Sequence, residues 1–324
     1  MQPQNPERET TSNCSGLHLS RAEFLRISAA AVVATAVGGG RTAAGAANPA
    51  PVMTRKIPSS GAALPAIGVG TWQVFDVGAG AAERAPLAQV LETLFAGGGT
   101  VVDSSPMYGR AEGVAGDLLA ASNSRAKAFI ATKVWTRGRA EGIAQMERSF
   151  GLFKTDKIDL MQVHNLLDCD THLQTLRGWK ADGRIGYIGV THYTSSAYRE
   201  LEVVLRKEKL DFVQLNYAMD DRAAEKVLLP LAADKGIAVL INRPFGGGGL
   251  LRTLKGRALP AWAAEVGCTS WAQILLKFIV SHPAVTCTIP GTAKPEHMLD
   301  NLDAGRGVLP DAAMREKMAA AIAS

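Results

Sequence analysis

The sequence predicts an α/β fold of the (β/α)8 TIM-barrel class, and three observations support this prediction. Short runs rich in Val and Ile alternate with longer amphipathic segments between residues 66 and 292. These runs are almost continuously hydrophobic, which is typical of parallel strands that helices cover on both faces. A polar residue, or Gly291 in the last run, lies at or near the end of each run. These positions lie about 25 to 32 residues apart, the length of one βα unit, until a final interval of about 48. Eight such units in succession form a closed barrel.

Each element of the barrel can be assigned to a range of residues. The eight expected strands are 66–71, 100–105, 128–134, 158–165, 185–193, 211–219, 236–245 and 285–292. Helical spacing of apolar residues predicts helices at 85–96, 197–207, 223–235 and 271–281. The long last interval predicts an excursion at 246–269, and residues 57–70 predict a small hairpin across the barrel floor. The alternative, a doubly wound sheet, requires a reversal of strand order that nothing in the sequence marks.

The first 46 residues are expected to be a targeting segment and not part of the fold. Arg21 and Arg26 precede a weakly apolar run at 27–37, and residues 44–46 fit the small-x-small rule for cleavage. The order Ser-Arg-x-x-Phe-Leu-Arg resembles a twin-arginine export signal. Ala22 stands in place of its second arginine, so another secretion route, a retained anchor and a disordered tail remain alternatives.

This interpretation divides the chain into a signal segment at 1–46, a linker at 47–54 and a barrel domain at 55–324. The protein is then expected to be periplasmic or exported, or cytoplasmic if the first segment is not functional. The apolar run is too short and too rich in Ala for a membrane span. We therefore expect no stable membrane insertion after processing.

Composition excludes several classes of protein. The 324 residues are 47% hydrophobic and 20% charged, which favours a large core over a disordered chain. The net charge is +5 without a dense basic run, so we expect a slightly basic surface and no nucleic-acid partner. The four cysteines show no CxxC or metal-ligand spacing. Free thiols are therefore the default, an isolated disulfide is the alternative, and we expect a monomer without a metal.

Four side chains of different chemistry lie at the ends of three successive expected strands. Asp103 and Tyr108 lie in VVDSSPMYG, Lys133 lies in FIATKV, and His164 lies in LMQVHN. The carboxyl ends of parallel barrel strands meet at one face, and that face carries the chemistry in such barrels. A carboxylate, a phenol, an amine and an imidazole that meet there can move a proton at neutral pH. A single strand-end Asp or His is more often a satisfied structural residue, so the prediction rests on the set.

The roles of the four follow from their acid–base chemistry. A free phenol has a pKa of about 10, and the nearby ammonium of Lys133 would lower the pKa of Tyr108. Asp103 could hold Lys133 in an ion pair, and a neutral His164 could donate a hydrogen bond to a substrate oxygen. The alternative is a Schiff-base lyase with Lys133 as nucleophile. Asp103 would raise the pKa of Lys133, however, and this opposes the lyase reaction.

The signals for phosphate binding are weaker. No G-x-G-x-x-G motif follows an expected first strand, and the sequence contains no Walker motif. The glycines at 246–249 follow the seventh strand, where bare backbone can approach a pyrophosphate, although a flexible hinge explains them equally well. Thr292, Lys294 and His297 follow the last strand and flank an expected helix start. A helix N-terminus with such donors is a phosphate site, and an ordinary capped helix is the alternative.

The segments VVDSSPMYG, IATKV, LMQVHN, IGVTHY, VQLNY and IPGTAKPEHMLDN, in this order and spacing, resemble the aldo-keto reductases. The resemblance covers about residues 55–322. It implies a barrel that binds a nicotinamide dinucleotide, usually NADPH, without a Rossmann fold. Such a protein reduces a small carbonyl compound, an aldehyde or a ketone, to an alcohol, or runs the reverse. The resemblance assigns Asp103, Tyr108, Lys133 and His164 as the catalytic tetrad, with Tyr108 as the acid.

The resemblance also implies which residues bind the cofactor. Thr191, His192 and Gln214 would hold the nicotinamide amide. The adenosine-phosphate end would lie near Thr292, Lys294, His297 and Asn301.

This chain departs from the family pattern at three places. The family often has Ser-Asn where this chain has Thr191 and His192, and a stacking tyrosine where this chain has Asn242 or Arg243. Arg243 would lie over the nicotinamide ring or reach a phosphate. A lysine that often follows Ile-Pro is Gly291 here. NADP preference therefore rests on Lys294 and His297 after the last strand, and NAD is the alternative cofactor. The alternative function is a regulatory barrel that binds the cofactor with little turnover.

Overall fold

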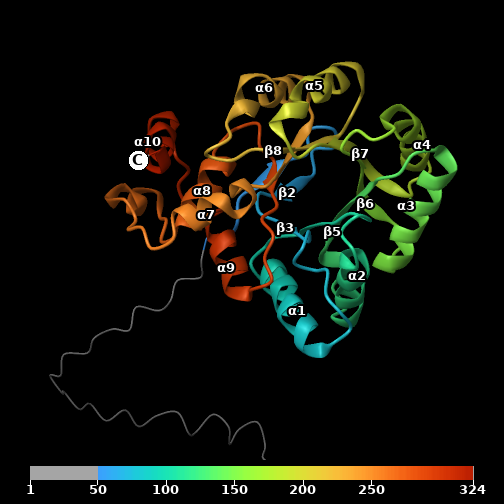
Figure 1. Ribbon diagram of the computed structural model, residues 1–324, viewed down its shortest axis with the longest axis horizontal. Helices are drawn as coiled ribbons and strands as arrows, with labels where there is room; N and C mark the ends of the chain where they lie inside the picture. The colour runs from blue at the N-terminus through green and yellow to red at the C-terminus, as the bar shows by residue number, and fades with distance from the viewer. Residues whose placement is uncertain (1–49, 324) are drawn as a thin grey trace, which may run out of the picture. The chain divides into compact units, whose positions relative to one another are not determined.

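The computed structural model describes residues 50–323, which form a barrel of parallel strands surrounded by helices (Figure 1). The barrel strands follow one another around the sheet in sequence order. Parallel bridges from Ile67 to Thr288 and from Gly70 to Gly291 join the first strand to the last. The predicted (β/α)8 barrel is therefore confirmed. Its strands are β3 (Val69–Gly70), β4 (Val101–Asp103), β5 (Phe129–Val134), β6 (Ile158–His164), β7 (Ile185–Thr191), β8 (Phe212–Asn216), β9 (Ala238–Asn242) and β10 (Cys287–Thr288).

Helices follow the strands and cover the outside of the barrel (Figure 1). The expected excursion after β9 contains a 3-10 turn at Gly246–Gly248, the short helix α7 (Gly249–Thr253) and a 3-10 segment at Ala261–Val266. The longer helices are α1 (Ala81–Ala96), α2 (Ala111–Ala121), α3 (Arg139–Phe153), α4 (Cys169–Ala181), α5 (Tyr198–Lys207), α6 (Leu228–Lys235), α8 (Trp271–Val280), α9 (Pro295–Asp303) and α10 (Ala312–Ala323).

One expected helix is divided in two. Residues 223–235 form a 3-10 segment at Ala223–Lys226 and then α6, with Val227 in a non-helical conformation between them. Pro230 explains the break, because a proline ring clashes with the carbonyl four residues earlier, here that of Lys226. The apolar spacing across both pieces was therefore correct, but a single continuous helix was wrong.

A hairpin closes one end of the barrel, as the sequence predicts. Its strands, β1 (Thr54–Lys56) and β2 (Ala63–Pro65), pair antiparallel. Ile57 and Leu64 from this hairpin are buried and join an apolar cluster with inward-facing strand residues. The hairpin therefore acts as the floor of the barrel and leaves the carboxyl ends of the strands open.

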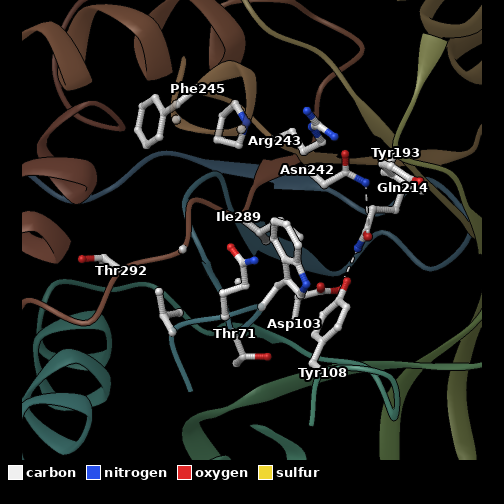
Figure 2. Close-up of a pocket in the computed structure, with 18 of the residues that line it drawn as sticks. Thr71, Asp103, Tyr108, Tyr193, Gln214, Asn242, Arg243, Phe245, Ile289 and Thr292 are labelled. Carbon is white, nitrogen blue, oxygen red and sulfur yellow. Dashed lines mark hydrogen bonds between the residues drawn. The ribbon is translucent and has the colours of Figure 1, made fainter. Parts of the chain in front are cut away.

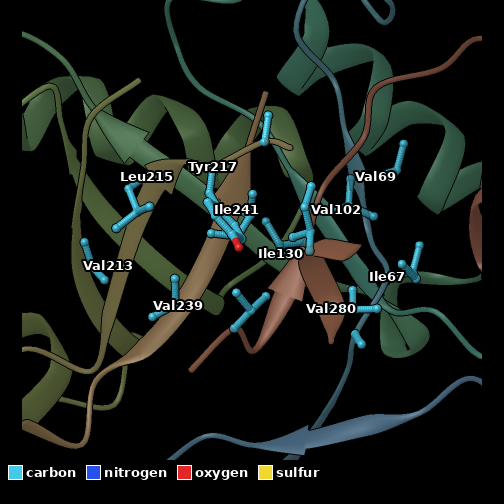
Figure 3. Close-up of a cluster of buried hydrophobic side chains, with 14 of the residues drawn as sticks. Ile67, Val69, Val102, Ile130, Val213, Leu215, Tyr217, Val239, Ile241 and Val280 are labelled. Atoms are coloured by element: carbon cyan, nitrogen blue, oxygen red, sulfur yellow. The ribbon is translucent and has the colours of Figure 1, made fainter. Parts of the chain in front are cut away.

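Side chains alternate along each strand between the barrel interior and the layer of helices. Ala131 and Leu160 belong to the apolar cluster inside the barrel. At the next inward positions the polar residues Lys133 and Gln162 are fully buried, and inward strand ends surround the cavity of Figure 2. Outward residues pack against the helices in the larger cluster that Figure 3 shows, with Ile130 among them. Because inward positions recur at every second residue, the polar side chains lie directly above the apolar cluster inside the barrel.

The folded unit begins within the segment that we expected to be a linker. The described residues from 50 onward belong to one compact unit. Val52 is already buried, and the amide of Met53 donates to the carbonyl of Gly305. The predicted signal segment at 1–46 lies outside the described residues. Within residues 50–323, no helix has the length and apolar character needed to cross a membrane.

Candidate active site

An elongated cavity of about 640 Å³ lies at the carboxyl ends of the barrel strands. Figure 2 shows Asp103 and Gln214 near one end of this cavity, and Thr292 and Phe245 toward the other. Most of the residues predicted to form the site line it, namely Asp103, Tyr108, His164, Thr191, Gln214, Asn242, Arg243, Thr292, His297 and Asn301. Lys133 lies beneath the lining, and the side chains of His192 and Lys294 lie outside it.

Lys133 and Asp103 form a buried ion pair under the cavity. The ammonium Nζ of Lys133 donates to Oδ2 of Asp103 at 2.8 Å and to the carbonyl of Ser104 at 2.5 Å. The side chain of Lys133 is fully buried, so its charge is paired rather than solvated. The same nitrogen lies 5.1 Å from the centroid of the Tyr108 ring. The strand ends of β4 and β5 therefore bring the predicted carboxylate, amine and phenol together.

Burial and charge act in opposite directions on this cluster. Burial disfavours a charged Lys133, but the negative charges that Asp103 and Tyr108 can carry outweigh it, and the pKa of Lys133 is raised. Burial raises the pKa of Tyr108, and the ammonium of Lys133 opposes that rise. For Tyr108 the effect of burial is the larger one, so its pKa is raised and not lowered as the sequence led us to expect. Tyr108 is therefore a neutral phenol that can donate a proton.

His164 lies against Tyr108 at the end of β6. The two rings meet edge to face, with centroids 5.8 Å apart. Burial lowers the pKa of His164 to about 2, and the charge of Lys133 adds to this effect. The imidazole is therefore neutral at physiological pH. Its Nδ1 lies 2.9 Å from the hydroxyl of Ser105, a contact that our reading of the sequence missed.

Amide side chains form the wall of the cavity beside Asp103. Nε2 of Gln214 donates to Oδ1 of Asp103 at 2.7 Å, and the hydroxyl of Thr191 donates to Oε1 of Gln214 at 3.2 Å. Nδ2 of Asn242 donates to the carbonyl of His192 at 3.1 Å. Oδ1 of Asn242 is buried and has no partner within residues 50–323. This wall therefore presents hydroxyl and amide groups to any ligand above the tetrad.

His192 and Tyr193 face different surroundings. The ring of His192 lies outside the cavity lining, and its Nδ1 accepts from the amide of Thr194 at 3.3 Å. Tyr193 lines the cavity instead and stacks on His192, with ring centroids 5.5 Å apart. Tyr193 lies two residues beyond Thr191, past the end of β7, so strand periodicity does not determine which of these side chains enters the cavity.

The loop after β9 supplies glycine backbone at the rim of the cavity. Gly246, Gly247 and Gly248 have φ values of 59°, 67° and 86°, a region that favours glycine. Gly247 and Gly248 line the cavity. The exposed guanidinium of Arg243 lies 5.8 Å from the centroid of the Tyr193 ring. The run of glycines is therefore required by its backbone conformation, in addition to the space it leaves for a ligand.

The start of α9 forms the far end of the cavity. The amide of Lys294 donates to the hydroxyl of Thr292 at 3.1 Å, which turns the chain into the helix. His297 lines the cavity, whereas the side chain of Lys294 is exposed outside it. Asp300 also lines the cavity, and Ser270 and Gln273 hold its carboxylate through hydrogen bonds of 2.7 Å each. The far end is therefore less cationic than the sequence suggests.

The cavity residues fit a nicotinamide dinucleotide. The unpartnered oxygen of Asn242, together with Thr191 and Gln214, offers acceptors and donors to a carboxamide. Gly247 and Gly248 line the cavity without side chains, and the start of α9 forms its far end, so backbone at both places can approach phosphates. An acid, a neutral imidazole and polar groups along one elongated cavity are suited to proton transfer beside a bound cofactor.

Comparison with known proteins also supports a nicotinamide-dependent barrel enzyme of the aldo/keto reductase family. The model of the aldo/keto reductase family matches residues 66–321. Two Bacillus subtilis proteins are similar, the uncharacterized oxidoreductase YcsN, 29% identical over 168 residues, and the aldo-keto reductase YhdN, 25% identical over 190 residues. These matches cover 48% and 54% of this chain and 55% and 56% of the relatives. The chain thus spans a little over half the length of these two relatives.

Two solved structures of an aldo/keto reductase from Klebsiella pneumoniae are also similar. The complex with NADP and acetate has a TM-score of 0.68 at 26% identity and covers 81% of this chain and 93% of that chain. The complex with NADPH has a TM-score of 0.69 at 25% identity and covers 81% and 92%. Because the family model spans most of the chain and these relatives share its barrel, this chain belongs to the aldo/keto reductase family.

Proposed function

We propose that the protein reduces an aldehyde or a ketone to an alcohol with NADPH, or runs the reverse, and that Tyr108 is the general acid. The observation that carries this proposal is the buried Lys133–Asp103 pair beneath Tyr108, beside the neutral imidazole of His164. The bound dinucleotide supplies the hydride. The residues of the chain hold the carbonyl and deliver the proton.

Each of the four side chains has a distinct part in this reaction. Tyr108 donates its phenolic proton to the carbonyl oxygen as negative charge develops there. Lys133 stabilises the phenolate that remains, and Asp103 keeps Lys133 charged and in place. His164 donates a hydrogen bond to the same carbonyl oxygen and orients it.

NADP is the proposed cofactor for two reasons. The similar Klebsiella structures contain NADP and NADPH. In this chain His297 and Thr292 line the cavity next to the start of α9, where an added phosphate group would meet a helix N-terminus. Because Gly291 is neutral and Lys294 lies outside the lining, we expect a modest preference for NADP over NAD.

A single pair of measurements tests the proposal. Wild-type protein should oxidise NADPH in the presence of a generic aldehyde, which absorbance follows directly. Tyr108→Phe removes the proton donor and keeps the ring, so turnover should fall at least about 100-fold while dinucleotide affinity stays within about twofold. Tyr187→Phe is the matched control, since this tyrosine lies at the barrel floor, where its hydroxyl contacts Ser60. Near-wild-type turnover in Tyr108→Phe would rule out the assigned acid.

The geometry disfavours the first alternative function, and an assay decides the second. A Schiff-base lyase needs an accessible amine with a lowered pKa, whereas Lys133 is fully buried, ion-paired and raised in pKa. Borohydride reduction in the presence of substrate should therefore trap no adduct. A regulatory barrel would bind the dinucleotide without turnover, and the absorbance assay separates it from an enzyme.

We further propose that the protein is exported, by way of the segment at 1–46. The support is the order of charged, apolar and small residues in that segment. Expression of the full chain in a bacterial host, followed by fractionation and N-terminal sequencing, tests it. A mature N-terminus near Ala46 in the periplasm is the expected result, and loss of export in a host without the twin-arginine translocase would identify the route. An uncleaved protein in the cytoplasm would contradict export.

A further inference from the structure

We propose that Ser105 is a positioning residue, which holds the imidazole of His164 in the tautomer that carries its proton on Nε2. This inference rests on the proposed carbonyl reduction, because Nε2 is the ring nitrogen left to face the cavity. The contact that carries it joins Oγ of Ser105 to Nδ1 of His164 at 2.9 Å.

Ser105 lies on the loop that also carries the proposed acid. It follows β4 by two residues and precedes Tyr108 by three, and it is fully buried. The amide of Tyr108 donates to the carbonyl of Ser105 at 3.0 Å, so the two residues form one turn. One short segment therefore places the phenol and holds the neighbouring imidazole, although His164 comes from a different strand.

The direction of the hydrogen bond follows from the other contact of the hydroxyl. The amide of Met107 donates to Oγ of Ser105 at 3.4 Å, so that oxygen already acts as an acceptor. Within residues 50–323, Nδ1 of His164 is the acceptor available to the hydroxyl proton. If Nδ1 carried a proton instead, the buried hydroxyl proton of Ser105 would have no partner, which is unfavourable. Ser105 therefore donates, and Nδ1 of His164 accepts.

An accepting Nδ1 fixes the rest of the ring. Because burial and Lys133 keep His164 neutral, the ring carries one proton, and that proton must lie on Nε2. An Nε2–H group can donate to a carbonyl oxygen beside Tyr108. The other tautomer would present a lone pair to that oxygen and repel it. The hydroxyl of Ser105 thus selects the tautomer that the proposed reaction requires.

The tautomer can be measured in the wild-type protein without any substrate. Two-bond ¹⁵N–¹H correlation spectra of protein labelled at histidine distinguish a ring protonated on Nε2 from one protonated on Nδ1. His164→Gln identifies the signal of His164 among the six histidines. We expect His164 to show the Nε2–H pattern. A ring protonated on Nδ1 would overturn the proposal outright, whatever the enzyme turns over.

Variants then separate positioning from a purely structural role. Ser105→Ala should lose the fixed tautomer, lower kcat/KM for the aldehyde roughly tenfold and leave the dissociation constant for NADPH unchanged. Ser105→Thr keeps a hydroxyl and should restore both the spectrum and most of the activity. Ser149→Ala is the matched control, because Ser149 is also fully buried but lies on α3 with Glu112 and Gln145 as its partners.

The outcomes distinguish this proposal from the proposed function. An Nε2–H pattern that persists in Ser105→Ala with full activity would show that Ser105 does not select the tautomer. The same pattern with reduced activity would assign Ser105 a structural role and also overturn the proposal. If no carbonyl compound is reduced by the wild-type protein, the proposed function fails, and the spectra still decide whether Ser105 orients His164.

Discussion

The floor and the rim of the cavity are built in different ways. At the floor, Lys133, Asp103 and His164 are buried and each has a defined partner. At the rim, Arg243 and His297 are exposed, and three successive glycines have positive φ values. The floor is therefore organised before any ligand arrives, which favours catalysis because no reorganisation is needed at the moment of reaction. The rim is suited to admit and release a large ligand.

The largest expected effect comes from breaking the floor. Lys133→Met removes the ammonium and leaves the carboxylate of Asp103 buried without its counter-ion. We expect turnover to fall at least about 100-fold and the free energy of unfolding to fall by about 3–5 kcal/mol. Residual activity should extend to higher pH, since loss of the ammonium raises the pKa of Tyr108 further.

Chemical denaturation and pH–rate profiles measure these effects. Reduction requires a protonated Tyr108, so the wild-type rate should decline as the pH rises through the pKa of that phenol. The double variant Asp103→Asn with Lys133→Met removes both charges and should recover part of the lost stability, without recovering turnover. An unchanged pH profile in Lys133→Met would show that Lys133 does not tune Tyr108.

The sequence predicted that Asp103, Lys133 and His164 lie close together, because strand ends in a barrel leave little freedom. Once the segments containing Asp103, Lys133 and His164 are neighbouring parallel strands, their carboxyl ends must meet. The alternating period of two also places Lys133 inside the barrel. The sequence did not predict the contact between Ser105 and His164. This contact depends on the path of the loop after β4 and on the orientation of the imidazole ring, and the spacing of residues in the sequence determines neither.

The rim was harder to predict for a physical reason. His192 and Lys294 were chosen by residue type and position, yet neither side chain lines the cavity. Lys294 starts α9 with extended backbone, and an exposed lysine at such a position is free to point into solvent. Tyr193 was missed because the strand ends at Thr191, and beyond that point no strand periodicity marks which side chain enters the cavity. Charge patterns therefore locate a rim, but local backbone geometry decides which side chains form it.

A smaller effect is expected when the backbone of the rim is constrained. Gly247 has a φ of 67°, and a Cβ there would lie 3.0 Å from Nη2 of Arg243. Gly247→Ala should therefore cost roughly 1–2 kcal/mol locally and weaken NADPH binding up to about tenfold. The value of kcat should change by less than about twofold, because the floor is untouched.

Fluorescence titration with NADPH and steady-state kinetics test this separation. Gly151→Ala is the matched control, since Gly151 lies within α3 and a Cβ there meets no atom within 4 Å. A large loss of kcat in Gly247→Ala with unchanged affinity would mean that the loop acts on the floor, and the two regions would then not be independent.

The smallest expected effect distinguishes two basic side chains at the start of α9. The sequence assigned both Lys294 and His297 to a 2′-phosphate, whereas the structure shows only the latter in the cavity lining among residues 50–323. Lys294→Ala should then weaken NADP binding by about twofold or less, since an exposed charge near a helix start contributes little through solvent. His297→Ala should weaken NADP binding more than NAD binding, because a direct donor to a phosphate is lost.

Dissociation constants of both variants for both dinucleotides show which of the two side chains contacts the 2′-phosphate. A selective loss of NADP affinity in Lys294→Ala alone would show that the side chain of Lys294 turns into the cavity when the dinucleotide binds, and the rim would then be shaped by its ligand.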